Sequence, residues 1–542
     1  MLLLMLSSCS TVFFGALWGM AALLPAGCAG QELVPSSPPQ WAADSATVRL
    51  AAGPQYSRGA VWRFFWGTHY RRIWATPVTV PVLRLATAHG GLLPLQAGGS
   101  YQSHTLRLRA ATGRQYVLRS VDKNASAALP AGWRRKLLGG LMKDQTSVTQ
   151  PYGAYVAAQL AEAAGVLHTN PRLVYVGDDP GLGKFRAAYA NALYLLEERP
   201  EGDQRSQPSF GYSPAVINTA RMLTSLRETP AAQPNARAYL RARLLDVWIG
   251  DWSRREDQWR WASFPQPGRV TYRPIPRDRD QAFFLFDDGV LTRLISWFLP
   301  KMQSFHPSIR PGAVEGLTAT ARALDRTLLA TLGPDDFIQV ADSLRRQLSD
   351  AVIDAALRAG PAETQAAVAA QLGPQLRRRR EQLPAVARRY YQVLAAEAWV
   401  VGTDRAERFV VSGAGPGRLR VRLLAHRPSQ PDSLISEQVY ARSATRQLDL
   451  YGLGGDDAFE IEPNLAPGFA VNIYPGAGHN QANSSGPGPA GARPARVGVV
   501  WHSGPGSRPA GAPIPGLTAR PDPHPERTAN VTGWLQRYNL ND

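Results

Sequence analysis

The spacing of apolar and polar residues divides the chain into regions of different character. The segment TPVTVPVLRL predicts a strand with proline at its edge, and HTLRLRAATGRQYVLRSVD alternates around Thr112-Gly113, which predicts a hairpin. The next segment, PYGAYVAAQLAEAAG, has helical spacing, with Gly165 placed to end the helix. Together with the short strand RLVYVGDD, these elements predict a β-rich lobe over residues 61–180.

Residues 181–402 have mainly helical spacing, which two acidic loops interrupt. Near the end of this region the segment PQLRRRREQL carries four consecutive arginines, Arg377 to Arg380. A charge run of this kind is typical of a solvated helix face. The pattern therefore predicts a helical lobe that ends at residue 402.

From Glu407 the spacing changes to period two. The segments RFVVSG, GRLRVRLLAH, SEQVYAR and RQLDLYGL predict short strands between turns, so residues 403–480 are expected to form an all-β module. The turn Gly454-Gly455-Asp456-Asp457 is similar to the turns of calcium-binding β-rolls. Because it occurs once and not as an array, a plain tight turn is the favoured interpretation.

Both ends of the chain differ from the middle. Residues 1–30 are apolar and uncharged, which is typical of a secretory signal, and Cys28 stands in a segment similar to a bacterial lipoprotein box. An uncleaved membrane anchor is the alternative. Residues 31–60 predict a linker, and residues 481–542, rich in Gly and Pro, predict a flexible tail. The expected location is the periplasm, the outer membrane or the cell surface.

The composition of the chain excludes several kinds of site and partner. Both cysteines of the 542-residue chain, Cys9 and Cys28, lie in the apolar N-terminal segment, so no disulfide framework and no cysteine metal site are expected. The net charge of +18 comes mostly from arginine, which suits anionic lipid or polysaccharide. No basic module interleaved with aromatic residues occurs, so no nucleic-acid partner is expected. The GxSxG, HExxH and Walker patterns are absent as well.

The candidate chemistry lies between Leu245 and Phe286. The first of two acid-bearing loops runs from Asp251 to Gln258, and the second contains Asp278 and Asp280, directly after an extended segment. Two such loops joined by a hairpin can place a catalytic loop beside a metal-holding carboxylate, which suits phosphoryl transfer. The alternative is a solvated, salt-bridged turn. The flanking apolar residues favour a turn that packs against a core.

This layout, and the residues SRREDQ and PRDRDQAF in the two loops, resemble the atypical kinase-like proteins: the HipA toxin kinases, the spore-coat CotH kinases and the secretory-pathway Fam20 kinases. Over residues 50–480 the chain also resembles exported proteins of Bacteroidetes-type bacteria that often precede an outer-membrane barrel. WGTHYRRIWATPVTVPVLRL, YVLRSVDK and YGLGGDDAFEIE carry that second resemblance. The expected fold class is α+β, with a two-lobed protein-kinase-like fold followed by an all-β sandwich-like module.

The resemblance implies a metal site in the second loop. Asp280 matches the metal-binding aspartate, and Asp278 stands close enough in the sequence to share the ion. Gln258 stands at the position of the family's asparagine and has an amide oxygen to offer. Carboxylate and amide oxygens suit Mg²⁺ or Mn²⁺, which would accompany ATP.

The resemblance fits the catalytic loop less well. Ser253 stands where the family has its catalytic aspartate, and Arg255 stands where it has histidine. Asp251 lies two residues earlier and substitutes as the base only if the loop is shifted, since a carboxylate must reach the hydroxyl that it deprotonates. The candidate catalytic residues are therefore Asp251 and Ser253.

The nucleotide-anchoring strand is altered too. Its internal cation is Arg119 instead of lysine, with Lys123 four residues further on and Glu162 as the glutamate of the following helix. Arginine binds phosphate in a bidentate manner but lacks the compact charge of lysine. A cross-strand ion pair is the equally weighted alternative for Arg119.

Three functions follow as expectations. The first is a degenerate, pseudokinase-like scaffold that binds a cell-envelope protein, lipid or glycan, without a cofactor. The second is an active atypical kinase that uses ATP. The third is a passenger domain of an outer-membrane assembly, with a β-barrel as partner. The residues at Ser253, Arg255 and Arg119 favour the first over the second.

Overall fold

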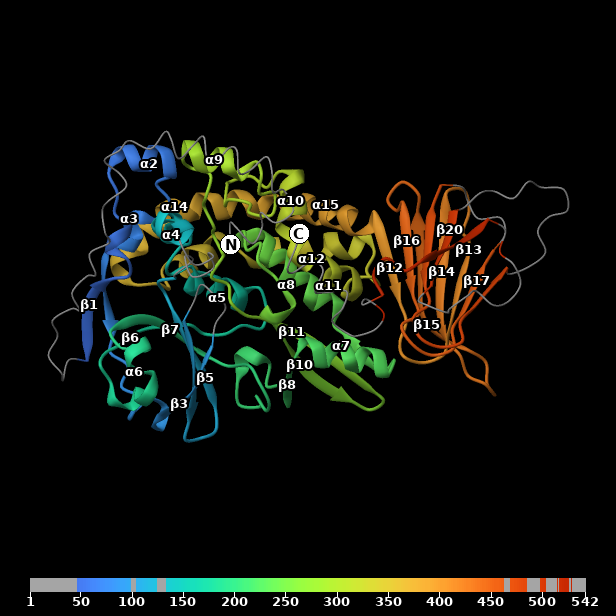
Figure 1. Cartoon of the computed structure of the whole chain (residues 1–542), viewed down its shortest axis with the longest axis horizontal. Coiled ribbons are helices and arrows are strands. Elements are labelled where there is room, and N and C mark those ends of the chain that lie inside the picture. Colours follow the sequence, from blue (N-terminus) through green and yellow to red (C-terminus); the bar gives the residue numbers. More distant parts are fainter. Residues whose placement is uncertain are drawn as a thin grey trace.

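The computed structural model describes residues 46–98, 104–123, 133–462, 468–484, 498–503, 514, 516–525 and 528. Both helices and strands occur among these residues, which confirms the expected mixed α and β content. In Figure 1 a β-rich region lies at the left, helices fill the centre, and two packed sheets lie at the right. No helix within these ranges is long and apolar enough to cross a bilayer. The predicted signal segment, including Cys28, lies outside the described residues.

The β-rich region contains a five-stranded sheet in which every neighbouring pair is antiparallel. Its order is β3-β4-β5-β7-β6, with β3 (Leu92–Gly98), β4 (Thr105–Ala110), β5 (Gln115–Ser120), β6 (Arg172–Val176) and β7 (Ala192–Glu198). The predicted hairpin is β4 and β5, joined through Thr112-Gly113. The last strand, β7, lies beyond the predicted limit of this lobe at residue 180.

Part of the predicted linker is ordered as a strand. β1 (Thr47–Ala51) pairs antiparallel with β2 (Pro77–Pro81), the predicted edge strand. Between them lie α2 (Ala60–Trp66) and α3 (Arg71–Ala75). Val78 and Val80 of β2 are fully buried while their neighbours are exposed, so alternation sets which face packs on the core.

The helical region is built around α8 (Ala236–Ile249), where every residue from Ala242 to Ile249 is buried. Helices α5 (Gly153–Ala163), α10 (Pro311–Thr318), α12 (Pro334–Gln347), α14 (Ala362–Glu381) and α15 (Leu383–Ala395) pack against it. The other helices after α3 are α4 (Trp133–Asp144), α6 (Arg186–Tyr189), which lies in the β-rich region in Figure 1, α7 (Thr219–Glu228), α9 (Val290–Ser296), α11 (Arg322–Leu328) and α13 (Asp350–Leu357). α5 is the helix predicted before Gly165, which follows it with a φ of 65°. A helix buried on all sides, such as α8, belongs to the centre of a large core.

One arginine of the predicted solvated run is buried. Arg379 on α14 donates hydrogen bonds to the carbonyls of Val247 and Trp248, at 2.7 Å each, in the last turn of α8. It also lies over the ring of Phe305. The solvated-face prediction is wrong for Arg379, because the last carbonyls of a buried helix need a donor.

A four-stranded sheet of order β8-β10-β11-β9 takes two strands from before α8 and two from after it. It consists of β8 (Ala215–Asn218), β9 (Ala232–Pro234), β10 (Trp259–Gln266) and β11 (Arg269–Pro276). The β10–β11 hairpin joins the two acidic loops, as the sequence predicts. It therefore fixes the separation of the two loops through a regular ladder of hydrogen bonds.

The C-terminal module consists of two five-stranded sheets with an apolar core between them. One sheet is fully parallel: β12 (Glu397–Val401), β16 (Gln447–Tyr451), β18 (Ala470–Tyr474), β20 (Gly498–Ser503) and β21 (Leu517–Pro521). The other has the order β15-β14-β13-β17-β19, with β13 (Glu407–Gly413), β14 (Arg418–Ala425), β15 (Ser433–Ala441), β17 (Ala458–Ile461) and β19 (Gln481–Ser484). Residues 481–542, predicted as a flexible tail, thus supply β19, β20 and β21 to these sheets.

The chain passes repeatedly from one sheet to the other, so the module is a coil of stacked parallel strands. Three related turns make this passage, at residues 402–406, 452–457 and 475–480. Neighbouring turns touch: a Cβ on Gly478 would lie 1.9 Å from the carbonyl oxygen of Gly455. The Gly454–Asp457 turn is therefore the middle one of three, although its sequence pattern occurs once.

Side chains link these turns in a ladder. The amide of Glu407 donates to Oδ1 of Asp457, and the amide of Asp457 donates to Oδ1 of Asn480, both at 2.9 Å. On the outer side of the parallel sheet, Tyr451 stacks on Tyr474 with ring centroids 4.7 Å apart, and Tyr474 stacks on His502 at 4.5 Å. Polar and aromatic side chains thus repeat at the strand spacing along the coil.

Candidate functional site

The structure brings the predicted nucleotide-anchoring cations to the predicted metal-binding aspartates. Arg119 on β5 forms an ion pair with Asp278, with Nη1 2.6 Å from Oδ1. Lys123, just beyond β5, pairs through Nζ with Oδ2 of Asp280. The loop after β11 is thereby tied to the five-stranded sheet. These four residues form the candidate site.

Arg119 also has a partner on its own sheet. Its Nε lies 3.9 Å from Oε1 of Glu197 on the neighbouring strand β7, and both side chains are buried. The predicted glutamate, Glu162, is instead exposed near the end of α5. The prediction of Glu162 was wrong, because β7 pairs next to β5 and places Glu197 diagonally beside the arginine. The cross-strand ion pair expected as the alternative for Arg119 is present.

The pKa values of the two aspartates of the second loop are shifted in opposite directions. Burial acts to raise the pKa of Asp278, but Arg119, Lys123 and neighbouring arginines hold it well below its usual range. Burial raises the pKa of Asp280, the negative charge of Asp278 raises it further, and Lys123 opposes both. Asp278 also has a φ of 60°, a strained conformation for a residue with a side chain. The loop conformation is thus stabilised by the ion pairs that it makes.

In this arrangement the predicted metal donors do not fit Mg²⁺ or Mn²⁺. Asp278 and Asp280 each have an oxygen paired with a cation, and Oε1 of Gln258 accepts a hydrogen bond from the amide of Arg255 at 3.1 Å. No group of three or more metal-ligating side chains occurs in the described part of the chain. A divalent ion needs several oxygen donors at once, and one oxygen of each aspartate already faces a cation of the protein.

The first loop is held by a buried aspartate. Asp251 is fully buried, its Oδ1 accepts a hydrogen bond from the amide of Ser253 at 3.2 Å, and its Oδ2 pairs with Arg254. Burial raises the pKa of Asp251 to about 7; Arg254 opposes this, while Asp246 and Asp280 add to it. Both oxygens of the predicted base are therefore bonded within its own loop. Ser253 is partly exposed beside it.

Arg254 connects the two loops. Its Nε lies 3.2 Å from Oδ2 of Asp246 on α8, and its Nη1 donates to the carbonyl oxygen of Arg277. Arg279 of the second loop reaches the other oxygen of Asp246, at 3.1 Å. Asp246 thus pairs with one arginine from each loop, and all three side chains are buried.

Asp246 was not predicted as a site residue. Its signal in the sequence is an acid inside the apolar run LLDVWI, three residues after Arg243, whose Nη1 lies 3.6 Å away in the structure. Arg243 is also buried and pairs with Asp325 on α11 at 2.9 Å. A charged residue in a buried helix must be paired, so this pattern marks a buried ion-pair network.

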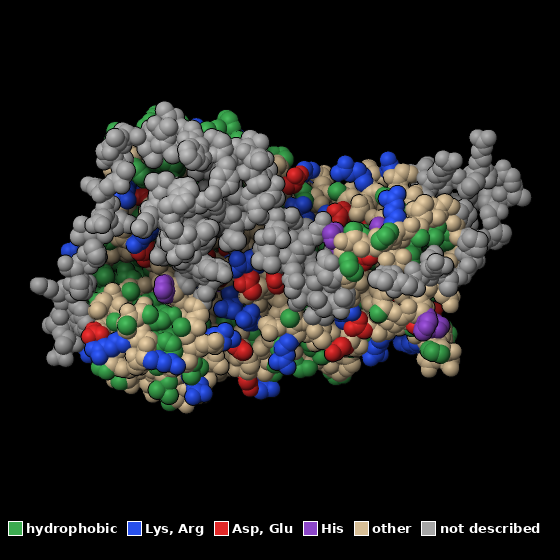
Figure 2. Space-filling model, in the orientation of Figure 1, with side chains coloured by type: hydrophobic (Ala, Val, Ile, Leu, Met, Phe, Trp, Pro, Cys, Tyr) green, Lys and Arg blue, Asp and Glu red, His purple; other side chains and the backbone are tan. Residues whose placement is uncertain are grey.

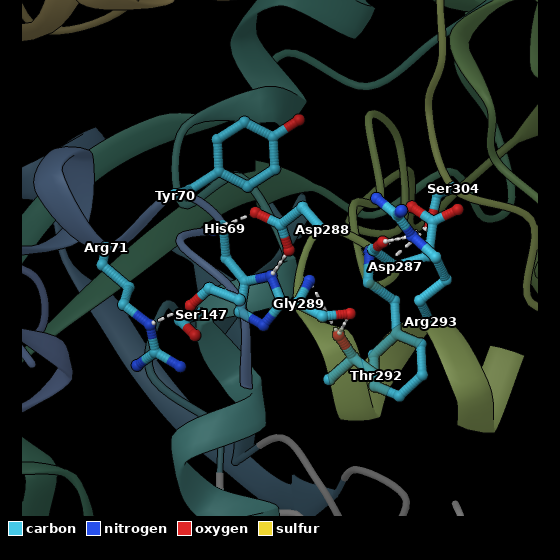
Figure 3. A network of polar contacts seen from close by, with 12 residues as sticks. His69, Tyr70, Arg71, Ser147, Asp287, Asp288, Gly289, Thr292, Arg293 and Ser304 are labelled. Atoms are coloured by element: carbon cyan, nitrogen blue, oxygen red, sulfur yellow. Dashed lines mark hydrogen bonds and ion pairs between the residues drawn. The ribbon is translucent and has the colours of Figure 1, made fainter. Parts of the chain in front are cut away.

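Beyond the site, the chain continues to two aspartate–histidine contacts, and Figure 3 shows the one between His69 and Asp288. Nδ1 of His69 lies 2.6 Å from Oδ1 of Asp288, and the amide of His69 donates to Oδ2 at 2.7 Å. Nε2 of His306 lies 2.8 Å from Oδ2 of Asp287. The contacts of His69 join this stretch to the segment between α2 and α3, whereas His306 lies between α9 and α10.

Comparison with known proteins gives partial likenesses to solved structures only. The chain matches no family model and no curated protein sequence. Among solved structures it is similar to the proinflammatory kinase CtkA of Helicobacter pylori, at 11% identity and a TM-score of 0.30, over 57% of this chain and 98% of that chain. It is also similar to the Rio2 kinase of Chaetomium thermophilum in its ADP/Mg²⁺-phosphoaspartate complex, at 15% identity and a TM-score of 0.25, over 54% of this chain and 72% of that chain. Both are atypical kinases, but at these TM-scores no conclusion about this chain rests on them.

Proposed function

We propose that this chain is an exported, kinase-like protein with a degenerate site, which acts as a binding or scaffold domain of the cell envelope. The observation that carries the proposal is the pair of ion pairs Arg119–Asp278 and Lys123–Asp280. The chain's own cations neutralise the two carboxylates that the resemblance assigns to a metal.

The order of the parts supports the kinase-like fold. A five-stranded antiparallel sheet comes first, then the buried helix α8, the loop with Ser253, the β10–β11 hairpin and the loop with Asp280. This is the order that the resemblance predicts. The site lies where the sheet and the helical region meet, which is where a nucleotide would have to bind.

The catalytic loop supports a degenerate site. Ser253 at the base position has no carboxylate to accept a proton, and Arg255 at the histidine position pairs with Asp257 at 3.0 Å. Asp251 is bonded to Ser253 and Arg254 in its own loop. Phosphoryl transfer depends on metal ions that neutralise the developing charge and on a positioned base. Neither is provided in this arrangement.

Sequence features support export and an envelope partner. The apolar segment 1–30 resembles a secretory or lipoprotein signal, and the charge of +18 suits an anionic surface. The partner is accordingly an envelope protein, a lipid or a glycan, and an outer-membrane β-barrel falls within the same class.

A nucleotide-binding assay tests the degenerate site. The melting temperature is measured with ATP, with Mn²⁺ and with both, for the wild type and for Asp280→Ala as the matched variant. We expect no metal-dependent increase in either protein. A metal-dependent increase in the wild type that Asp280→Ala abolishes would contradict the proposal. Transfer of radiolabelled phosphate that Asp251→Ala abolishes would establish an active kinase instead.

A further inference from the structure

One face of the molecule exposes a cluster of large apolar side chains on α2 and α9. Among the described residues thirteen large apolar side chains are exposed, and seven of them lie on these two helices or directly after α9. They are Val61 (66% exposed), Phe64 (62%), Phe65 (39%), Val290 (49%), Leu294 (41%), Trp297 (73%) and Phe298 (56%). We call them the α2–α9 patch, which Figure 2 shows as hydrophobic side chains along the upper edge.

The backbone holds α2 and α9 close together. A Cβ on Gly289, which precedes α9, would lie 2.4 Å from the amide nitrogen of Gly67, which follows α2, so only glycine allows the two helix ends to approach so closely. The pair of His69 with Asp288 joins the same two segments (Figure 3). The two helices are therefore held side by side before any partner binds, with Trp66 buried beneath them.

The charges beside the patch are positive. Arg63 on α2 and Arg293 on α9 are both exposed among the apolar side chains. The nearby acids, Asp287 and Asp288, are paired with His306 and His69. Aromatic side chains with arginines at their border are typical of helices that lie in the interface of a membrane.

We propose that the α2–α9 patch binds the surface of an anionic lipid bilayer. The apolar side chains enter the boundary between headgroups and acyl chains, and Arg63 and Arg293 contact lipid phosphates. The proposal rests on the proposed function only in taking the cell envelope as the site of action. It does not depend on the state of the nucleotide site, so either can fail alone.

The test places a reporter on the patch. In the full chain with Cys9 and Cys28 replaced by serine, Trp297→Cys carries an environment-sensitive fluorophore, and Leu434→Cys on β15 (57% exposed) is the matched control. Phosphatidylcholine vesicles are added with and without phosphatidylglycerol. We expect a blue shift at position 297 that requires phosphatidylglycerol and that salt weakens, and no shift at position 434. This contrast separates insertion of the patch from any membrane contact of the N-terminal segment.

Charge reversal sharpens the test. Arg63→Glu and Arg293→Glu are each expected to weaken vesicle binding at position 297 at least about fivefold, whereas Arg422→Glu, an exposed site on β14, leaves it unchanged.

Several outcomes would overturn the proposal. An unchanged fluorophore at position 297 with both kinds of vesicle would do so, whether a protein partner or residues 1–30 occupy the patch. A blue shift without vesicles that grows with protein concentration would assign the patch to a second copy of the chain. Equal shifts at positions 297 and 434 would show that binding does not use the patch.

Discussion

Buried carboxyl groups occur in two regions of this molecule, and the two regions differ in the partners that surround them. Where the sheet meets the helical region, Asp246, Asp251 and Asp278 each pair with at least one arginine. In the C-terminal module, Glu407 and Asp457 receive hydrogen bonds only from amides and a hydroxyl among the contacts seen. Burial penalises charge in both regions, and a nearby cation opposes that penalty.

The pKa values of these carboxyl groups reflect the balance between burial and nearby cations. For Asp278 the surrounding cations outweigh burial and hold the pKa well below its usual range. In the module, burial raises the pKa of Glu407 to about 7, and burial together with the charge of Glu407 raises the pKa of Asp457 to about 9. Burial also raises the pKa of Asp449 to about 6. In the first region the balance varies, since the pKa of Asp278 is lowered while that of Asp251 is raised to about 7; in the module the pKa values of Glu407, Asp457 and Asp449 are all raised.

The largest expected change in the free energy of unfolding comes from removing an arginine where the sheet meets the helical region. Arg254→Ala leaves Asp246 and Asp251 buried without the arginine that joins them, which should lower the free energy of unfolding by about 3–5 kcal/mol. Denaturant titration measures this change. The matched control is Arg255→Ala in the same loop, whose surface pair with Asp257 contributes only about 0–1 kcal/mol. Equal losses in the two variants would contradict the comparison.

The second prediction concerns pH and the module. Because the pKa of Asp457 is raised in the folded state, its contribution is fully present below the unfolded pKa and is lost as pH rises toward about 9. Within that window the loss is about 1.4 kcal/mol per pH unit for such a group. The free energy of unfolding should fall between pH 6 and pH 8 by about 3 kcal/mol, measured by denaturant titration at the two pH values.

Asp457→Asn serves as the control for this pH dependence. An asparagine keeps the acceptor for the amide of Glu407 and cannot ionise. The variant should match the wild type at low pH and exceed it at pH 8. A pH profile unchanged by the substitution would assign the dependence to other groups.

A smaller effect is expected at the candidate site. Lys123→Ala removes the cation from Asp280, which should lower the free energy of unfolding by about 1–2 kcal/mol and should expose a carboxylate to divalent ions. A melting-temperature increase with Mn²⁺ is expected in this variant and not in the wild type. The double variant Lys123→Ala/Asp280→Asn should lose that increase. If it persists in the double variant, Mn²⁺ binds elsewhere.

The smallest effect distinguishes the predicted from the observed partner of Arg119. Glu162→Ala changes an exposed side chain and should alter the free energy of unfolding by less than about 0.5 kcal/mol. Glu197→Ala removes a buried partner of the arginine and should cost more, about 1–2 kcal/mol. Thermal unfolding of the two variants side by side checks this order, and a larger loss for Glu162→Ala would reverse it.

Local patterns predicted the elements that lie close together in the chain. The β4–β5 hairpin, α5 and the β10–β11 hairpin all follow from spacing and turn residues over short stretches. The position of the two acidic loops follows in turn, because the hairpin joins them. Asp278 and Asp280 could thus be placed near the first loop from the sequence, whereas only the family resemblance assigned Arg119 to the same site.

Contacts between distant segments could not be predicted in this way. Glu197 reaches Arg119 only because β7 pairs with β5, and spacing within either strand does not reveal that pairing. The strands of residues 481–542 could not be predicted from the sequence for a similar reason. Their segments are short, they lie between Gly- and Pro-rich stretches, and they are stabilised by parallel neighbours from earlier turns of the coil.

The coil of parallel strands has a mechanical consequence. Each strand of the parallel sheet bonds only to its neighbours, and the first, β12, is fastened to the helical region by the pair of Arg326 and Glu397 at 2.9 Å. A force applied at the C-terminal end of the parallel sheet would therefore remove its strands one at a time, beginning with the edge strand β21.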